Sequence, residues 1–212
     1  MLRLTIAFAV LCLPTALAAQ PLTTAERAAI ERTVTSTLRE TRVPSAQVSV
    51  VRGGELVFQG AWGKAAEAIP QARPDLPYQI ASNSKQFIAA LVLLLENDGK
   101  LSVDDPVARW LPDVSGAERI TLRHLLSHTA GLPDYWPHDY AFAATANPVT
   151  PDQIIARWGR QPLEFEPGTR WEYSNTGYVV AARIAEIAGG APLWQQLDQR
   201  LFTPLGIRPL PL

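Results

Sequence analysis

The sequence predicts an α+β fold in which one helix and a β-hairpin precede a long run of helices. A capped pattern with helical spacing covers residues 24–42, and two runs rich in β-branched residues flank Gly53-Gly54. The later periodic segments all have helical spacing. Strands that are segregated from helices are typical of α+β domains. A two-stranded hairpin alone is marginal in water and would need more strands beside it, but this sequence offers no convincing later strands.

The bulk properties exclude some classes of partner. The chain has 212 residues, of which 47% are hydrophobic, and this suggests one domain or slightly more, with ample material for a core. The formal net charge is -1, with no basic cluster, so nothing indicates a nucleic-acid partner. The partner that we expect is a small-molecule or peptide substrate.

The first 18 residues are predicted to be a signal peptide rather than part of the fold. A short basic start, Met1-Leu2-Arg3, precedes an apolar run over residues 4–13 and a small-residue cleavage site at Ala16-Leu17-Ala18. The apolar run is too short to span a membrane. We therefore expect a periplasmic or secreted mature chain, residues 19–212, with no membrane span.

The only cysteine supports this interpretation. Cys12 lies inside the predicted signal peptide, and the residues before it, Ala9-Val10-Leu11, lack the small residue expected beside a lipidated cysteine. Cleavage would remove Cys12. No internal disulfide is then possible, although export leads to a compartment in which disulfides persist.

The N-terminal elements follow from local signals. Thr23 and Glu26 form a capping-box pattern at the start of the first helix. Ile30, Val34 and Leu38 mark one apolar face of that helix. The strands of the hairpin are predicted over residues 46–52 and 55–60, and the proline-containing residues 61–78 should form a surface connection.

The second helix is predicted to begin near Ser82 and to end before Gly99, where glycine can adopt a left-handed conformation. Residues 132–149 should form a long aromatic loop, of the kind that often lines a site. Further helices are predicted over residues 103–111, 121–128, 151–158, 178–188 and 192–202.

Ser82 and Lys85 are the first candidates for chemistry. They lie three positions apart, so on a helix they share one face. The helix N-terminus supplies backbone N–H donors that can hold an oxyanion. A lysine acts as a base only when it is neutral, and burial among apolar neighbours lowers a lysine's pKa. The alternative interpretation makes Ser82 only a helix cap and Lys85 a surface side chain.

Tyr173 and Asn175 form the second candidate pair. They lie two positions apart, after a Pro167-Gly168 turn, and in an extended segment they would project to the same side. Tyrosine can relay a proton, and asparagine can offer a donor and an acceptor to a substrate amide. The simpler alternative is an ordinary aromatic strand end.

The three histidines suggest other chemistry. His124, His128 and His138 could form a Ser–His site or bind a metal ion. No H-E-x-x-H or G-x-S-x-G pattern supports either possibility, and a metal site would need a third ligand that is not evident. We therefore predict no metal site.

The two motifs together resemble the serine β-lactamase and penicillin-binding-protein superfamily. The likeness is greatest for its branch of class C β-lactamase-like proteins, esterases and D-alanyl-D-alanine carboxypeptidases. Ser82 and Lys85 match the S-x-x-K motif, and Tyr173 and Asn175 match Y-x-N. The segments 124–132 and 165–178 are also similar to segments of that branch.

The resemblance implies a fold, a reaction and a set of roles. The fold would be β-lactamase/transpeptidase-like, with an antiparallel sheet flanked by helices and an all-helical region. Ser82 would attack an amide or ester carbonyl and become acylated, and Lys85 would take or share its proton. Tyr173 would act as general base or proton relay, and Asn175 would bind substrate. No cofactor is implied, and the substrate could be a β-lactam, a D-Ala-D-Ala peptide or an ester.

The resemblance also implies a third motif, Lys or His, any residue, then Gly, on a late strand that supplies the second oxyanion donor. No lysine or histidine follows Asn175 in this sequence. We therefore expect residues 19–212 to be a partial β-lactamase-related serine hydrolase domain that lacks the C-terminal strands of the sheet. Two hypotheses stay open: an exported serine hydrolase, or a truncated, catalytically inactive relative or gene fragment that at most binds cell-wall-like ligands.

Overall fold

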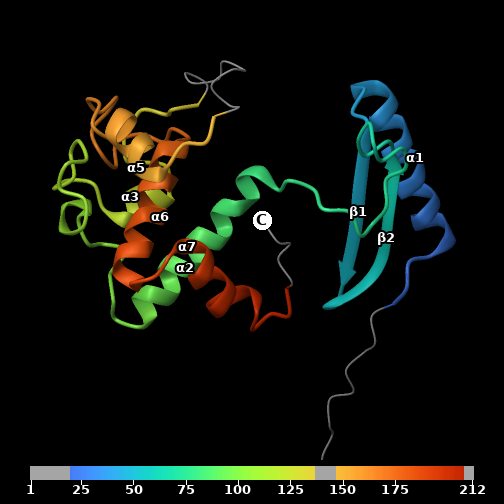
Figure 1. Ribbon diagram of the computed structural model, residues 1–212. Coiled ribbons are helices and arrows are strands. Elements are labelled where there is room, and N and C mark those ends of the chain that lie inside the picture. The colour runs from blue at the N-terminus through green and yellow to red at the C-terminus, as the bar shows by residue number, and fades with distance from the viewer. Residues whose placement is uncertain (1–19, 137–146, 208–212) are drawn as a thin grey trace, which may run out of the picture. The chain divides into compact units, whose positions relative to one another are not determined.

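The computed structural model describes residues 20–136 and 147–207 (Figure 1). These residues form two compact units, the first ending at Tyr78 and the second beginning at Gln79. The predicted signal peptide lies outside the described residues. So does the middle of the predicted aromatic loop, residues 137–146, which includes His138.

The first unit begins with α1 (Thr24–Thr41), as predicted. Thr23 and Glu26 form the predicted capping box, in which the Thr23 backbone N–H donates to the Glu26 carboxylate at 2.7 Å. The helix ends at Arg42, which adopts a left-handed conformation. Its apolar face is only half-buried, and none of its residues is fully buried.

The predicted hairpin is confirmed as two antiparallel strands, β1 (Ser45–Arg52) and β2 (Glu55–Gly63). Their register pairs Ser45 with Gly63 and Val50 with Phe58, with an irregularity after Val50. Gly53 and Gly54 both have positive φ, as the tight turn between right-twisted strands requires. Within the described parts of the chain these strands form one two-stranded sheet.

The connection after β2 is held against the hairpin by side-chain hydrogen bonds. The Gln47 amide donates to the carbonyls of Arg73 and Leu76, each at 2.7 Å. The Tyr78 hydroxyl donates to Ser45 Oγ at 2.8 Å. This predicted surface segment is therefore ordered by polar contacts rather than by a core of its own.

The second unit is organised around two apolar helices, α2 (Ser84–Asn97) and α6 (Asn175–Gly189). α2 buries Leu91, Val92 and Leu95 completely, and α6 does the same with Val180, Ala181 and Ile184. Both helices end as their sequences predict, since Gly99 and Gly190 have positive φ beyond the last turns.

The shorter elements of this unit pack around that pair. These elements are short helices of three to five residues, and two of them are π-helical turns that each continue a preceding α-helix. They are η2 (Val107–Arg109), α3 (Leu122–Leu126), α5 (Pro151–Ile154), η3 (Ile155–Gly159), α7 (Leu193–Leu197) and η4 (Asp198–Phe202). The helices predicted over 151–158 and 192–202 are confirmed in extent.

The prediction of a helix over residues 103–111 is wrong. Only η2, a single 3-10 turn, forms there. Pro106 is extended, with ψ at 144°, and bridges to Thr121 as in an antiparallel pair. The acidic residues that suggested a helix start are used elsewhere: Asp105 accepts from the Ser102 backbone N–H at 2.7 Å, and Asp104 pairs with Arg123.

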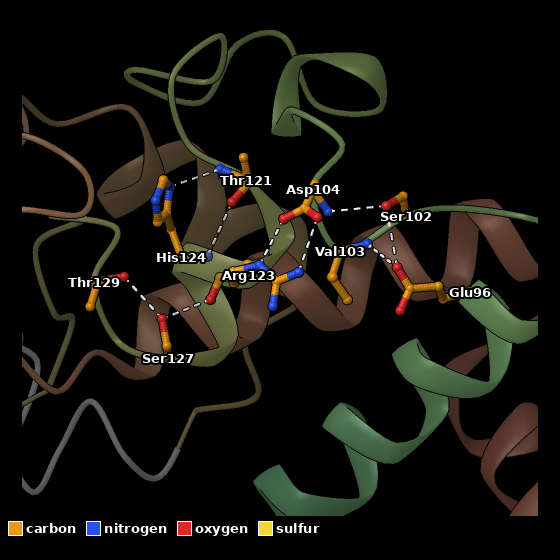
Figure 2. Close-up of polar contacts among 9 residues, drawn as sticks. All are labelled: Glu96, Ser102, Val103, Asp104, Thr121, Arg123, His124, Ser127 and Thr129. Carbon is orange, nitrogen blue, oxygen red and sulfur yellow. Dashed lines mark hydrogen bonds and ion pairs between the residues drawn. The ribbon is translucent and has the colours of Figure 1, made fainter.

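A polar network joins the end of α2 to α3 (Figure 2). Glu96 accepts from the Val103 backbone N–H at 2.7 Å. Asp104, one residue further on, receives two hydrogen bonds from Arg123 on α3, at 2.7 and 3.0 Å. α3 is too short to be stable alone, so this network and its two buried leucines hold it in place.

Candidate active site

Ser82 lies on a strained turn rather than on the first turn of the predicted helix. A 3-10 turn, η1 (Ala81–Asn83), precedes α2, and Lys85 is the second residue of α2. Ala81 has φ of 44°, a conformation that alanine rarely adopts. Strain of this kind in a non-glycine residue persists only where the surrounding structure enforces it, and it often marks a functional site.

The structure brings Ser82, Lys85 and Tyr173 together. Ser82 Oγ lies 2.6 Å from the Tyr173 hydroxyl, and Lys85 Nζ donates to Ser82 Oγ at 3.2 Å. Lys85 Nζ also lies 4.9 Å from the centre of the Tyr173 ring. Ser82 and Tyr173 are 91 positions apart in sequence, so only folding of the second unit assembles this group.

Asn175 joins the same group, but not from an extended segment as predicted. It is the first residue of α6, and Ser174 caps that helix by accepting from the Gly177 backbone N–H at 3.1 Å. The side chains of Tyr173 and Asn175 nevertheless converge, because Lys85 Nζ donates to Asn175 Oδ1 at 2.7 Å. Lys85 is half-buried between these partners.

Asp134 accepts two hydrogen bonds from Asn175. Its Oδ1 accepts from the Asn175 backbone N–H at 3.0 Å, and its Oδ2 accepts from Asn175 Nδ2 at 2.9 Å. The next residue is fastened to the same helix end, since the Tyr135 backbone N–H donates to Thr176 Oγ1 at 3.0 Å. The loop after Gly131 and the first turn of α6 thus form one polar assembly.

His128 supports Tyr173 from one side. Its ring centre lies 4.5 Å from that of Tyr173 and 5.1 Å from that of Tyr178. Its Nδ1 accepts from the Ser174 backbone N–H at 3.2 Å, and its carbonyl accepts from the Glu172 N–H at 2.9 Å. His128 has φ of 60°, so its backbone is held in a left-handed conformation.

The electrostatics of the site act on two titratable groups. Burial opposes ionisation of the Tyr173 phenol, but hydrogen bonding with Lys85 and Ser82 and the positive charge of Lys85 outweigh it. The pKa of Tyr173 is therefore below its usual value of 10.0. For His128, burial and then the charge of Lys85 lower the pKa below 6.5. Both shifts favour a neutral imidazole beside a phenol that ionises more readily than an ordinary tyrosine.

Two of the histidines considered as metal ligands, His124 and His128, contact other groups in the structure. His124 belongs to the cap of α3, where its Nδ1 accepts from the Thr121 backbone N–H at 3.2 Å. Over residues 20–136 and 147–207, no group of three His, Cys, Asp or Glu side chains gathers as a metal site would require.

Solvent reaches the candidate nucleophile. Ser82 is exposed, and Tyr173 is 37% exposed. Two indole side chains are open to solvent as well: Trp171, two residues before Tyr173, is 64% exposed, and Trp136, two residues after Asp134, is 45% exposed. Trp171 packs edge-on against His128, with ring centres 6.0 Å apart.

Sequence reasoning found Ser82, Lys85, Tyr173 and Asn175 but did not find Asp134, and it gave His128 no role in the site. A carboxylate in an otherwise apolar run, Gly131-Leu132-Pro133-Asp134, was the available signal. That signal is weak without the structure, because the partner of Asp134 is 41 positions away.

The comparison with protein families agrees with this geometry. The model of the beta-lactamase family matches residues 30–209, and the chain belongs to this family. Members of the family are serine hydrolases, among them esterases, peptidases and amidases. The predicted resemblance and the β-lactamase-like α+β fold are thereby confirmed for the part of that fold that the chain covers.

Two curated relatives show how much of the fold is covered. Penicillin-binding protein 4* of Bacillus subtilis (strain 168) is 35% identical over an alignment of 180 residues that covers 83% of this chain and 40% of that protein. Esterase EstB of Burkholderia gladioli is 36% identical over an alignment of 188 residues that covers 81% of this chain and 47% of that protein. The chain therefore spans less than half of these relatives.

A solved structure is matched over about half of its length. The D-amino acid amidase of Ochrobactrum anthropi SV3, complexed with D-phenylalanine, has a TM-score of 0.77 and 31% identity. The match covers 86% of this chain and 51% of that one. Separately, no helix within the described residues is long and apolar enough to cross a membrane.

Proposed function

We propose that this chain is part of an exported serine hydrolase that forms an acyl-enzyme at Ser82 on an amide or ester substrate. One observation carries the proposal: Ser82 Oγ lies between the Tyr173 hydroxyl, at 2.6 Å, and Lys85 Nζ, at 3.2 Å. A nucleophile within hydrogen-bond distance of its base, with the base held by a third group, is the arrangement that covalent catalysis needs.

The proposed reaction begins when Ser82 Oγ attacks the substrate carbonyl carbon. As the new C–O bond forms, the hydroxyl proton moves to the phenolate form of Tyr173, which becomes a neutral phenol, while the Lys85 ammonium donates a hydrogen bond to Oγ. The lowered pKa of Tyr173 favours the phenolate that accepts this proton, because hydrogen bonding with Lys85 and the positive charge of Lys85 stabilise it. When the bond to the leaving group breaks, Tyr173 returns the proton to the departing nitrogen or oxygen, and water later hydrolyses the ester.

Substrate and oxyanion contacts are also assigned under this proposal. The backbone N–H of Ser82, on the 3-10 turn η1 that precedes α2, supplies one oxyanion donor, and Asn175 contacts the substrate amide beside Lys85. Stoichiometric acylation reports the attack of Ser82 directly and does not require turnover.

The substrate class is proposed from the relatives together with the open site. Their names include a penicillin-binding protein, an esterase and a D-amino acid amidase, so the reactive centre would be a β-lactam, a D-configured amide or peptide, or a simple ester. The exposed Trp171 and Trp136 would offer apolar surfaces to the acyl group.

The direct test is covalent labelling of the purified chain with a fluorophosphonate and with a fluorescent penicillin. Peptide mass spectrometry should place the label on Ser82, and Ser82→Ala should abolish it. Ser84→Ala is the matched control, since Ser84 is an exposed hydroxyl two residues away. A folded sample that takes no label with either probe would support the alternative, a non-catalytic relative that at most binds cell-wall-like ligands.

A second variant tests the role of the phenol. Tyr173→Phe removes the oxygen that contacts Ser82 but keeps the ring that packs against His128. Labelling should slow by about 10²- to 10⁴-fold, the usual range for loss of a general base. A rate within threefold of the wild type would show that the Tyr173 oxygen does not take the serine proton.

Export is part of the proposal and has its own test. Residues 1–18 carry the pattern of a secretory signal, and cleavage after Ala18 would leave Ala19 as the new N-terminus. N-terminal sequencing of the protein recovered from the periplasm or medium of a bacterial host should read from Ala19. Retention of the first 18 residues in the cytoplasm would contradict export.

A further inference from the structure

We propose that Asp134 is a positioning residue, which sets the orientation of the Asn175 side-chain amide so that Oδ1 faces Lys85. This inference deepens the proposed function and rests on it for its kinetic consequence. Its structural content, the orientation of one amide by one carboxylate, stands independently of catalysis.

The donor and acceptor pattern leaves one orientation for the amide. An ionised carboxylate only accepts hydrogen bonds, and an ammonium group only donates them. Asp134 therefore requires Nδ2 of Asn175 on its side, where the distance to Oδ2 is 2.9 Å. Lys85 requires Oδ1 on the other side, where the distance to Nζ is 2.7 Å. Amide orientation is assigned from such networks, and here the partners at both ends agree.

Asp134 is itself fixed at three points. Its Oδ1 accepts from the backbone N–H groups of Asn175, at 3.0 Å, and Trp136, at 3.3 Å, in addition to the contact at Oδ2. The carboxylate also lies at the N-terminus of α6, where the helix dipole favours a negative charge. A half-buried carboxylate held in this way has little freedom to reorient.

The result is a chain of directed hydrogen bonds that ends on the nucleophile. Asn175 donates to Asp134, Lys85 donates to Asn175, and Lys85 also donates to Ser82 Oγ. If the amide turned over, its NH₂ group would face the lysine ammonium, donor against donor. Lys85 would then lose its shortest hydrogen bond and its position beside Ser82.

Asp134→Asn is the variant that separates this role from packing. Asparagine has the same shape but offers only one acceptor oxygen where Asn175 presents two N–H donors. Asp113→Asn is the matched control, because Asp113 is a carboxylate of the same unit that pairs with Arg160, at 2.8 Å, and does not contact the site.

The first measurement is independent of activity. The sequence has four asparagines, Asn83, Asn97, Asn147 and Asn175. Selective ¹⁵N-asparagine labelling of the full chain gives few side-chain amide signals, and Asn175→Ala assigns the relevant pair. Hydrogen exchange at the Asn175 amide should be slow in the wild type and in Asp113→Asn, and at least tenfold faster in Asp134→Asn. Unchanged protection in Asp134→Asn would overturn the proposal.

The second measurement is the rate of fluorophosphonate labelling at Ser82. It should fall about 10- to 100-fold in Asp134→Asn, which corresponds to loss of a hydrogen bond to a charged group. In Asp113→Asn it should stay within twofold of the wild type, with similar melting temperatures for both variants. Lost protection without slower labelling would also overturn the proposal. If the wild type takes no label, the proposed function fails, while the exchange experiment still decides the role of Asp134.

Discussion

The two compact units of this protein differ in how their residues are held. Among the described residues of the first unit, only Leu22, Ser45 and Ala72 are buried, and α1 buries none. The second unit has a continuous apolar core built on α2 and α6. Ser82, Lys85, Tyr173 and Asn175 all belong to the second unit.

The difference shows where a reactive group can be placed accurately. Catalytic side chains need support that holds them within a fraction of an ångström, and packed elements provide it better than half-exposed ones. The helices that carry Lys85 and Asn175 are also the two that pack most completely. The first unit is instead held by its hairpin ladder, a helix cap and a few side-chain hydrogen bonds.

The largest contrast is expected from truncating apolar side chains in the two units. Ile184→Ala removes a completely buried side chain from α6 and should lower the free energy of unfolding by about 2–5 kcal/mol. Leu56→Ala removes a side chain of β2 that is 54% exposed and should change it by less than about 0.5 kcal/mol. Guanidinium unfolding followed by circular dichroism measures both, and equal effects would refute the contrast.

Each unit contains a glycine that alanine cannot replace without strain, and these two glycines test the comparison between the units further. A Cβ at Gly131 would lie 2.2 Å from the Phe165 carbonyl oxygen, and one at Gly63 would lie 2.1 Å from that of Pro44. Both glycines have positive φ. Gly131→Ala should destabilise the second unit by about 2–4 kcal/mol, from backbone strain and overpacking, and should also slow labelling of Ser82.

Gly63→Ala should open the end of the hairpin, which hydrogen exchange along β1 and β2 would report. Gly99→Ala is the control for strain alone, since it has φ of 70° and no atom within 4 Å of the added Cβ. It should cost only about 1–2 kcal/mol. A Gly131→Ala variant no less stable than Gly99→Ala would show that the loop moves aside.

A smaller effect on the rate of Ser82 labelling is expected from pH, through protonation of His128. Burial and then Lys85 lower its pKa, so the folded state favours the neutral ring, whose Nδ1 accepts from Ser174. This contribution is complete above about pH 6.5 and is lost as the pH falls through the lowered pKa of the folded state. Protonation would place a donor against the Ser174 N–H, so labelling of Ser82 should slow in that acidic range.

His128→Asn tests this directly. Asparagine tolerates the left-handed backbone at this position and can place an oxygen near Nδ1, but it does not titrate. The acid limb of the labelling rate that belongs to His128 should disappear, with a change of less than about tenfold at neutral pH. An unchanged pH profile would assign that limb to another group.

The smallest expected effect is a pH dependence of the stability of α1 in the first unit. Hydrogen bonds from the Thr23 backbone and from Arg52 lower the pKa of Glu26 to about 2. Because its folded pKa is depressed, Glu26 stabilises α1 above its ordinary pKa of 4.5 and loses this effect as the pH falls toward 2. Glu26→Gln should flatten that acid dependence of the helical signal, whereas Glu31→Gln, farther along α1, should not.

Local signals predicted most of the secondary structure. The capping box of Thr23 and Glu26, the hairpin glycines, and the glycines that end α2 and α6 act within a few residues of themselves, so their effect is visible in sequence. The error at residues 103–111 has the opposite cause. Two carboxylates and a proline looked like a helix start, but Asp104 pairs with Arg123 and Pro106 bridges to Thr121, both distant in sequence.

In the candidate site, too, the local patterns can be predicted from the sequence and the long-range contacts cannot. Ser82 and Lys85 are three positions apart and can be recognised as a pair, and so can Tyr173 and Asn175. The helical position of Asn175 was not predicted, because the cap at Ser174 was read as part of an extended segment. Asp134 could not be identified from the sequence, since only the packing of its loop on α6 gives it a partner.

Sequence alone specifies the α+β class, the hairpin, the main helices and the four residues of the two motifs, since each depends on neighbours close along the chain. Packing of the second unit places Ser82 on a strained 3-10 turn, within 2.6 Å of a tyrosine from a distant segment. The same packing brings Asp134 to the Asn175 amide that contacts Lys85. Donor and acceptor geometry between segments 41 to 91 positions apart depends on the packing of the whole unit, and no local pattern specifies it.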